Sequence, residues 1–327
     1  CMPQTREHLT LLELLGVSHG FVVLTKADLV DDETLELAEM EILEETAGSF
    51  LQNAPVVRFS SVDKRGLEEV REALGKLSIE SPSKDIKSPF RMWIDQTRST
   101  PGFGTVVTGT VFSGSVSLEN AVKILPAEIK TRVRSIEVHH HKTERAVAGQ
   151  RAGINLHRIS VNDAARGMLL ADNGRPSSAP FINSALSLLP KAFRAVTNRQ
   201  VVRIHAGTAM AAARVFLMEK DILKPGETGL VQFRMNAPFP AVPGERFVIC
   251  PLGKHSILGG GRILETTREK FRIAKAHFVL PYLQNLQMDN LPGALEKMLS
   301  NQRRRPLSIW EISDRTGILP EEVDRKT

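Results

Sequence analysis

The sequence predicts an α/β unit followed by two all-β domains and a helical C-terminal segment, and three observations support this order. Over residues 1–80, helical apolar spacing alternates with short apolar runs, which is typical of α/β proteins. From about residue 90 to 265, short β-branched runs alternate with Gly, Pro and Asn turns, the pattern of sandwiches and barrels. After residue 268 helical spacing returns. The predicted fold class is therefore α/β plus all-β.

The α/β unit is predicted to begin with a leucine-rich helix and to continue with alternating strands and helices. Gly20–Leu24 and Pro55–Ser61 are the predicted strands, because both are short apolar or β-branched runs. Glu33–Ala47 and Gly66–Leu77 are the predicted helices. On the first of these helices the apolar side chains predict a buried stripe, formed by Leu35, Leu37, Met40, Ile42 and Leu43.

The β region is predicted to form two domains. A dip in hydrophobicity near residues 173–180 separates residues 90–174 from residues 180–268. Each half has the length of one β-barrel and its pattern of short strands separated by turns. The glycines in PGFGTVVTGTVFSGSV, residues 101–116, indicate places where backbones pass closely or bend at barrel corners.

Two further segments complete the domain prediction. Residues 81–89 combine Ser, Pro and charge without periodicity, which predicts a linker after a first domain of residues 1–80. Residues 270–327 are predicted to be helical. Within them, Ser308–Val323 has the pattern of a helix-turn-helix with Gly317 at the turn.

Composition narrows the functional classes. The chain is 42% hydrophobic and has no low-complexity tract, so it is predicted to be globular. No apolar run approaches the roughly 18 residues of a membrane span, which argues against a membrane partner. Only two cysteines occur, which excludes a disulfide framework and favours a cytoplasmic location.

The formal net charge of +6 is unevenly distributed. Residues 1–80 carry 16 acidic and 7 basic side chains, which leaves 21 acidic and 36 basic of the totals 37 and 43. An acidic first domain joined to a strongly basic remainder predicts that the remainder binds a polyanion such as RNA. A basic surface without a dedicated ligand is the alternative.

A possible base-reading loop follows the first predicted strand. Thr25-Lys26-Ala27-Asp28 ends that strand, and a fixed carboxylate there can accept both N1–H and N2–H₂ of guanine. The Lys26 methylene stem can lie along the purine face. Ser60 and Ser61 end the second predicted strand, where a backbone N–H can donate to guanine O6. Alternatively, Asp28 caps a helix or is simply solvated.

With MPQTREH at residues 2–8, these segments resemble the translational GTPases related to elongation factor Tu, which share a base-specificity motif Asn-Lys-x-Asp. Thr25 departs from the usual Asn, and Ser61 from the usual Ala. The resemblance implies GTP or GDP as cofactor, with Mg²⁺ in the intact protein. No Gly-x-x-x-x-Gly-Lys-Ser/Thr motif occurs in the chain, so neither the Mg²⁺ ligands nor a catalytic residue is expected within it. The chain is expected to be a fragment, truncated at both ends, that does not hydrolyse GTP alone.

Later segments resemble one branch, the selenocysteine-specific elongation factors. GTVVTGTV at residues 104–111 and GGGRILE at residues 259–265 carry this resemblance. It implies the C-terminal part of a P-loop GTPase domain, two β-barrels and the start of a winged-helix extension. The implied partners are selenocysteinyl-tRNA, the ribosome and a messenger-RNA hairpin bound by the extension, and a monomer is expected.

By the same resemblance, the selenocysteinyl group is expected to meet Asp95, Gln96 and Arg151. A selenolate needs fixed positive charge in a desolvated setting. Gln96 replaces a family cation, and Arg98, two residues further along the same strand face, can compensate. The alternative is that Asp95 and Arg151 form a barrel ion pair without a ligand.

The implied function is delivery of selenocysteinyl-tRNA at recoded UGA codons by a GTPase. One alternative is a general elongation or initiation GTPase of the same family. Another is a non-enzymatic tRNA- or RNA-binding protein that has lost its phosphate loop. No metal site is predicted, because the adjacent histidines His139–His141 point to alternate faces if they lie on a strand.

Overall fold

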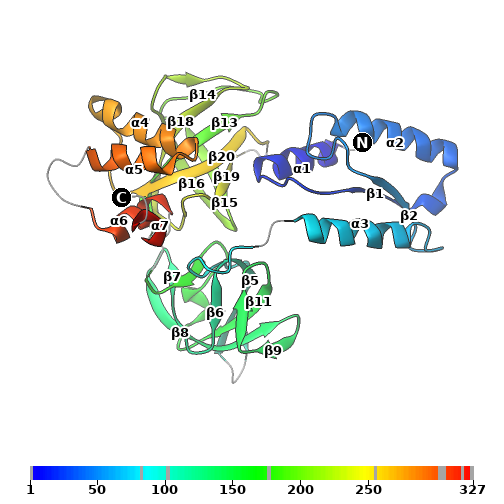
Figure 1. Cartoon of the computed structure of the whole chain (residues 1–327), viewed down its shortest axis with the longest axis horizontal. Helices are drawn as coiled ribbons and strands as arrows, with labels where there is room; N and C mark the ends of the chain where they lie inside the picture. The colour runs from blue at the N-terminus through cyan, green and yellow to red at the C-terminus, as the bar shows by residue number, and fades with distance from the viewer. Residues whose placement is uncertain are drawn as a thin grey trace. The chain divides into compact units, whose positions relative to one another are not determined.

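The computed structural model describes residues 3–81, 84–100, 104–174, 178–253, 256–300, 307–317 and 320–324. These residues form two compact units, Cys1–Ser83 and Lys84–Thr327 (Figure 1). Parts of the predicted linker, of the glycine-rich stretch at residues 101–116 and of the helical end lie outside the described residues.

The first unit is an α/β layer built on two parallel strands. Strand β1 (Val22–Thr25) pairs with β2 (Val56–Phe59), in a register that places Thr25 opposite Phe59. Parallel strands need a long crossover, which α2 (Asp32–Thr46) provides. Helices α1 (Pro3–Leu14) and α3 (Leu67–Glu80) complete the unit.

Helix α2 begins one residue before the prediction and buries less of its apolar surface than expected. Of the predicted stripe, Leu35 is buried, whereas Leu37, Met40 and Leu43 are each more than half exposed. Leu35 and Ile42 lie on the side of the helix that contains the buried Thr46. The other three share a second apolar face, which is more than half exposed. One stripe in the sequence is therefore two faces in the structure.

The second unit begins with barrel II. Six strands close a ring through the pairings β11–β5–β3–β12–β7–β8–β11. Their bounds are β3 (Arg91–Trp93), β5 (Gly104–Ser113), β7 (Ala121–Leu125), β8 (Ile129–Val138), β11 (Arg151–Leu156) and β12 (Leu169–Asp172). Strand β4 (Gln96–Thr100) pairs with β5 outside the ring, β9 (His141–Thr143) extends β8, and β6 (Ser115–Ser117) pairs with β10 (Arg145–Val147).

A close backbone approach in barrel II explains one predicted glycine. A Cβ atom at Gly109 of β5 would lie 2.1 Å from the Trp93 carbonyl oxygen of β3. Any side chain there would therefore push the two strands apart. The prediction that glycines allow close passage in this stretch is correct at Gly109.

Barrel III is a closed barrel of six strands in the order β13–β18–β16–β15–β19–β20. The strands are β13 (Ala179–Leu188), β15 (Val201–Ala206), β16 (Ala209–Leu217), β18 (Thr228–Phe239), β19 (Arg246–Pro251) and β20 (Gly259–Thr267), with β14 (Val196–Thr197) and β17 (Ile222–Leu223) as a separate ribbon. Its core includes Phe233 and Phe247, whose rings meet edge to face with centroids 5.1 Å apart. The fold class predicted from the sequence is thus confirmed for both β domains.

Barrels II and III share a core at strand β3. Trp93 is 6% exposed and belongs to the same apolar cluster as Ile204 and Phe247 of barrel III. A Cβ atom at Gly207 would lie 2.2 Å from the Trp93 indole, so only glycine leaves room for the ring. The Thr208 hydroxyl donates to the Ile94 carbonyl at 2.8 Å.

A buried charge lies beside this junction. Glu245 is 4% exposed, and its carboxylate is 3.6 Å from the Arg91 guanidinium. Burial raises the pKa of Glu245 to about 7, although Arg91 favours the ionised form. The cost of desolvating this carboxylate therefore exceeds the benefit of its ion pair.

The helical segment packs on barrel III. It comprises α4 (Ala276–Gln287), α5 (Leu291–Ser300), α6 (Ile309–Thr316) and α7 (Pro320–Asp324). Arg315 of α6 contacts Glu265 of β20 through Nε at 2.7 Å and Nη2 at 2.5 Å. Glu265 is 2% exposed and also accepts a hydrogen bond from Asn183 Nδ2 at 2.7 Å. Burial, followed by the Glu265 carboxylate, raises the pKa of the neighbouring Tyr282.

The stability of the barrel junction is expected to fall as pH rises towards neutrality. The folded state holds the Glu245 proton more tightly than the unfolded state, because the folded pKa is about 7 and the ordinary value is 4.5. The contribution is complete below the ordinary pKa and is lost as pH rises through about 7, with a size of about 3 kcal/mol. Glu245→Gln should remove this loss in urea unfolding at pH 5 to 8, followed by tryptophan fluorescence. An unchanged pH slope in Glu245→Gln, as in the exposed control Glu144→Gln, would contradict the assignment.

Removing Arg315 is expected to destabilise the docked helices, because it leaves the Glu265 carboxylate buried and unpaired. Arg315→Met should lower the free energy of unfolding by about 3 kcal/mol, measured by urea denaturation. The double variant Arg315→Met/Glu265→Gln should recover part of this loss, since the buried charge is then gone. No recovery in the double variant would show that the Arg315 stem, rather than its charge, stabilises the contact.

Candidate functional site

The carboxyl edge of the parallel strand pair brings the two predicted base-reading segments together. Thr25 is the last residue of β1, and Lys26 follows it with a left-handed φ of 62°. A single 3₁₀ turn, η1 (Ala27–Leu29), then carries Asp28, which is exposed. Ala27 is only 1% exposed and anchors this turn in the unit. The Asp28 carboxylate is thereby presented to solvent at the strand edge, where ligands of α/β sheets bind.

The segment after β2 is shaped by Ser60. Its side chain is buried, and its Oγ accepts hydrogen bonds from the Val62 and Asp63 amides at 3.1 and 3.4 Å. Its own N–H already donates to the Arg65 carbonyl at 3.0 Å. Among the described residues, the Ser61 N–H has no partner. Of the two predicted serines, Ser61 is therefore the one with a free amide for guanine O6.

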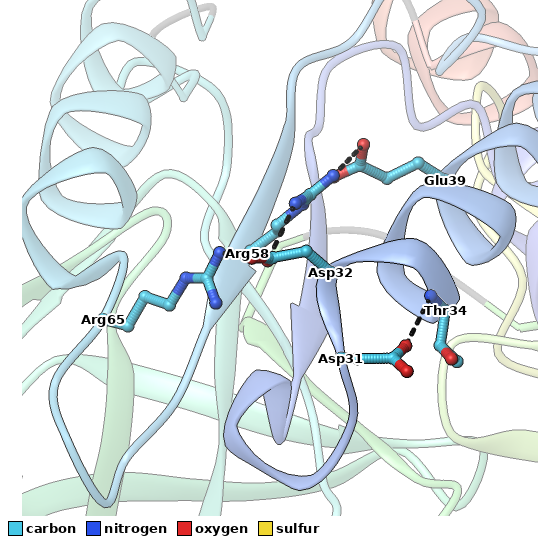
Figure 2. A network of polar contacts seen from close by, with 6 residues as sticks. All are labelled: Asp31, Asp32, Thr34, Glu39, Arg58 and Arg65. Carbon is cyan, nitrogen blue, oxygen red and sulfur yellow. Dashed lines mark hydrogen bonds and ion pairs between the residues drawn. The ribbon is translucent and has the colours of Figure 1, made fainter.

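A charged network connects helix α2 to strand β2 and the loop that follows it. Figure 2 shows Arg58 of β2 beside Glu39 of α2, with Nε–Oε1 and Nη2–Oε2 separations of 2.6 and 2.9 Å. Asp32, at the start of α2, contacts Arg65 at 2.9 Å and Arg58 at 3.4 Å (Figure 2). These hydrogen bonds lower the pKa values of Asp32 and Glu39.

This network positions the two candidate loops. Asp31 caps α2 by accepting the Thr34 N–H at 2.8 Å, three residues after Asp28 (Figure 2). The Asp32–Arg65 contact then joins this helix start to the loop of Ser60 and Ser61. Sequence reasoning did not find these residues. In the sequence these residues appear only as acidic positions on a predicted helix and basic positions near a predicted strand. Charged residues that are exposed to solvent and form no contacts give the same pattern.

A second candidate site lies on barrel II, where Asp95 and Arg151 meet. Asp95 follows β3, and its N–H donates to the Thr108 carbonyl of β5 at 2.9 Å. Arg151 begins β11 and is in register with Thr110 of the same strand β5. From opposite sides of β5, the Arg151 guanidinium reaches the Asp95 Oδ2 atom in a short ion pair.

The pair leaves hydrogen-bonding capacity unused. Arg151 is 52% exposed and contacts Asp95 through Nη1, and no described residue accepts a hydrogen bond from its other N–H groups. The second Asp95 oxygen, Oδ1, is buried and has no partner among the described residues. Such an arrangement holds a guanidinium in place and still lets it bind an anion.

Gln96 and Arg98 form a second contact on the neighbouring strand β4. The Arg98 Nη2 group donates to the Gln96 Oε1 atom at 3.0 Å, and both side chains are exposed. Gln96 lies opposite Thr108 of β5, next to the strand position of Asp95. The predicted residues thus form two contacts, Asp95 with Arg151 and Gln96 with Arg98. With both arginines charged and one carboxylate, the region is net positive.

The first two residues of the predicted histidine run form a turn, and His141 begins strand β9. His139 and His140 connect β8 to β9, with positive φ values of 51° and 66°. This is the two-residue hairpin geometry, which Asn and Gly usually occupy. All three histidines are exposed, and strand alternation does not apply to His139 and His140 because they lie between the two strands. Among the described residues no cluster of His, Cys, Asp or Glu has the arrangement of a metal site.

Within the described part of the chain, no helix is both long and apolar enough to span a bilayer.

Comparison with known proteins identifies both barrels. Residues 104–171 match the family described as elongation factor Tu domain 2. Residues 184–270 match the beta-barrel domain of the selenocysteine-specific elongation factor.

A curated relative covers most of the chain. The selenocysteine-specific elongation factor of Desulfomicrobium baculatum is 35% identical over 271 residues. That alignment includes 83% of this chain and 43% of the relative, so the chain spans less than half the relative's length.

Two solved structures share the fold. A bacterial selenocysteine-specific elongation factor, EF-Sec, superposes with a TM-score of 0.82 at 24% identity, covering 97% of this chain and 50% of that one. The apo form of translation elongation factor SelB from Methanococcus maripaludis gives a TM-score of 0.71, also at 24% identity, covering 81% and 62%.

Proposed function

Because the chain belongs to the selenocysteine-specific elongation factors, we propose that it serves the GTP-dependent delivery of selenocysteinyl-tRNA to the ribosome at recoded UGA codons. The observation that carries this proposal is the Asp95–Arg151 pair, which holds a partly free guanidinium at the barrel position expected for the aminoacyl group. The activity of the whole factor is part of the same proposal, since this chain covers only a portion of its relative.

Arg151 is the residue that would recognise the selenolate. A free thiol titrates near 8.5, and a selenol is considerably more acidic, so the selenocysteinyl side chain is an anion at neutral pH. The guanidinium donates hydrogen bonds to that anion, whereas the neutral seryl hydroxyl gains much less from it. Asp95 orients Arg151, and Arg98 adds positive charge where Gln96 replaces a family cation.

The first unit would bind the guanine of GTP or GDP. Asp28 would accept from the base, Lys26 would lie along the purine face, and Ser61 would donate to O6, with Ser60 shaping the loop and Thr25 ending the strand. These residues fit the base but not the phosphates, because the 327 residues contain no phosphate-loop motif. Hydrolysis chemistry and Mg²⁺ are therefore not assigned to residues of this chain, and we expect no GTPase activity from it alone.

The outer surface of barrel III offers a contact to the tRNA backbone. Arg214 Nη1 donates to the Arg199 backbone carbonyl at 3.1 Å, so the Arg214 guanidinium lies beside the backbone of a second basic residue. Arg234 stacks on the Phe216 ring at 3.4 Å from its centroid, and burial, followed by Arg199, lowers its pKa. Phosphates of an acceptor arm would neutralise this cluster. The helices docked on the same barrel would extend towards a messenger-RNA hairpin. We also propose that the protein is a monomer located in the cytoplasm.

The presence of Gln96 supports one alternative function, that of a general elongation GTPase. Without the family cation, the pocket is less positive, which favours a general elongation GTPase that does not distinguish seryl- from selenocysteinyl-tRNA. The Asp95–Arg151 contact by itself also fits an ion pair that only stabilises barrel II.

Substitution of Arg151 separates these possibilities. Arg151→Met should weaken selenocysteinyl-tRNA binding by about tenfold or more, because a charge-assisted hydrogen bond is lost, and should leave seryl-tRNA binding nearly unchanged. The measurement is the protection of each aminoacyl ester from hydrolysis by the 327-residue chain, with Lys142→Met as the matched loss of an exposed cation. Equal losses for both tRNAs would support a stabilising ion pair, and equal binding by the parent chain would support a general factor.

The base assignment is tested at Asp28. Asp28→Asn replaces one acceptor by a donor, so binding of guanine nucleotides should fall by at least tenfold while xanthine nucleotides gain affinity. Isothermal titration or line broadening in NMR can follow this change at high nucleotide concentration, since the phosphates add little here. Glu33→Gln, an exposed carboxylate on α2, is the control. If Asp28→Asn leaves the guanine preference intact, Asp28 does not read the base.

A further inference from the structure

We propose that barrel II carries a second RNA-binding site, at the end of strand β11 opposite to Arg151, where Lys130, Arg132 and Arg158 surround a cavity and bind backbone phosphates. This site goes beyond the proposed function, because it contacts neither the base loop nor the aminoacyl position. The cavity has a volume of about 560 Å³.

The walls of the cavity are held by three segments of barrel II. Lys130, Thr131 and Arg132 belong to β8, and Arg132 is in register with Ala121 of β7. The turn after β11 is pinned to β8 twice. The His157 N–H donates to the Arg132 carbonyl at 3.0 Å, and the Thr131 hydroxyl donates to the His157 carbonyl at 2.7 Å.

Arg158 follows in a left-handed backbone conformation, with φ of 51°. A bulky residue in this conformation is uncommon and costs energy, so the packed segments around it must enforce it. The result is that Arg158 lines the same cavity as Lys130 and Arg132 although it lies outside β11. Three cations from two segments therefore converge on one depression.

The charges around this cavity are not balanced by the protein. Glu119 is the one carboxylate in the lining, and it lies 3.8 Å from the His157 Nε2 atom. Among the described residues, no carboxylate forms an ion pair with Lys130, Arg132 or Arg158. Like charges held close together repel each other, and an anion bound between them would relieve that repulsion.

The shape and lining favour a phosphate backbone over a base or a small metabolite. Among the described residues, no Phe, Tyr or Trp lines the cavity and His157 contributes its one ring, so the lining offers little stacking surface for a base compared with its three cations. The cations are spread along an open depression, as phosphate contacts are in RNA-binding surfaces. The excess of 15 basic side chains after residue 80 supports the same class of ligand.

The position of the site separates it from the aminoacyl pocket. Arg151 begins β11 and His157 follows its last residue, six residues later, which corresponds to roughly 20 Å for extended chain. A terminal aminoacyl group at Arg151 cannot also reach Arg158. The second site therefore binds either a different part of the same tRNA or another RNA, such as that of the ribosome.

The test measures how RNA binding depends on salt. The variant Arg132→Gln/Arg158→Gln is compared with the parent chain and with the matched control Lys87→Gln/Lys142→Gln, which removes two exposed cations elsewhere in the second unit. Fluorescence anisotropy records binding to deacylated tRNA, to small ribosomal subunits and to protein-free ribosomal RNA. Thermal unfolding verifies that all variants are folded.

The variant should reduce the slope of log K against log salt by about 1.5, since each lost phosphate contact contributes about 0.7 to 0.9. If the variant and the parent chain bind RNA equally at 1 M salt, this smaller slope makes the variant bind roughly 30-fold more weakly than the parent at 0.1 M salt. A loss with deacylated tRNA alone identifies the tRNA backbone as the ligand. A loss with ribosomal subunits and protein-free ribosomal RNA identifies ribosomal RNA.

Two results overturn the proposal. The first is a slope that changes no more than in the control for every RNA. The second is a loss confined to intact subunits, which would indicate an acidic ribosomal protein as the partner. The tRNA is deacylated and no nucleotide is added, so none of these outcomes depends on selenocysteine recognition or on GTP.

Discussion

The packing of Trp93 against Gly207 is the contact on which the second unit depends. A side chain at Gly207 would overlap the indole, so the two barrels can approach this closely only with glycine there. The short segment around Trp93 also carries the other junction contacts, because Arg91 faces Glu245 and the Ile94 carbonyl accepts from Thr208. Asp95 is the next residue. The candidate aminoacyl site is therefore built directly on the segment that joins the barrels, and a movement between them would move Asp95.

Charge has different roles in the two units. In the first, the contacts of Arg58 and Arg65 with acidic side chains of α2 position two loops at one strand edge. In the second, basic side chains outnumber acidic ones, and Lys130, Arg132 and Arg158 line one cavity without an ion pair to any described carboxylate. The Asp95–Arg151 pair combines both roles, because Asp95 orients the guanidinium without using all its donors. Stabilisation and ligand binding are compatible in such a pair.

Several expectations from the sequence were correct because they rest on local rules. Strand and helix types in the first unit followed apolar periodicity, and Gly109 has the close backbone contact that a barrel glycine implies. Others needed the tertiary structure. Leu37, Met40 and Leu43 repeat with helical spacing as Leu35 does, yet burial depends on which face meets the sheet. Ser60 and Ser61 were equivalent in the sequence. In the structure the Ser60 N–H donates to the Arg65 carbonyl, so Ser60 cannot offer its amide to a base.

The sequence by itself determined the order of the domains, the family and the residue types available at each candidate site. These properties follow from local periodicity, turn residues and motifs, which the neighbouring residues specify. The sequence offered the Asp95–Arg151 ion pair as one interpretation, and the tertiary structure shows that contact across β5. Tertiary structure alone decided that Arg315 contacts Glu265 and that Arg158 joins Lys130 and Arg132 around one cavity. Those contacts join residues from different strands and helices. Their pairing depends on strand register and barrel closure, which no single segment encodes.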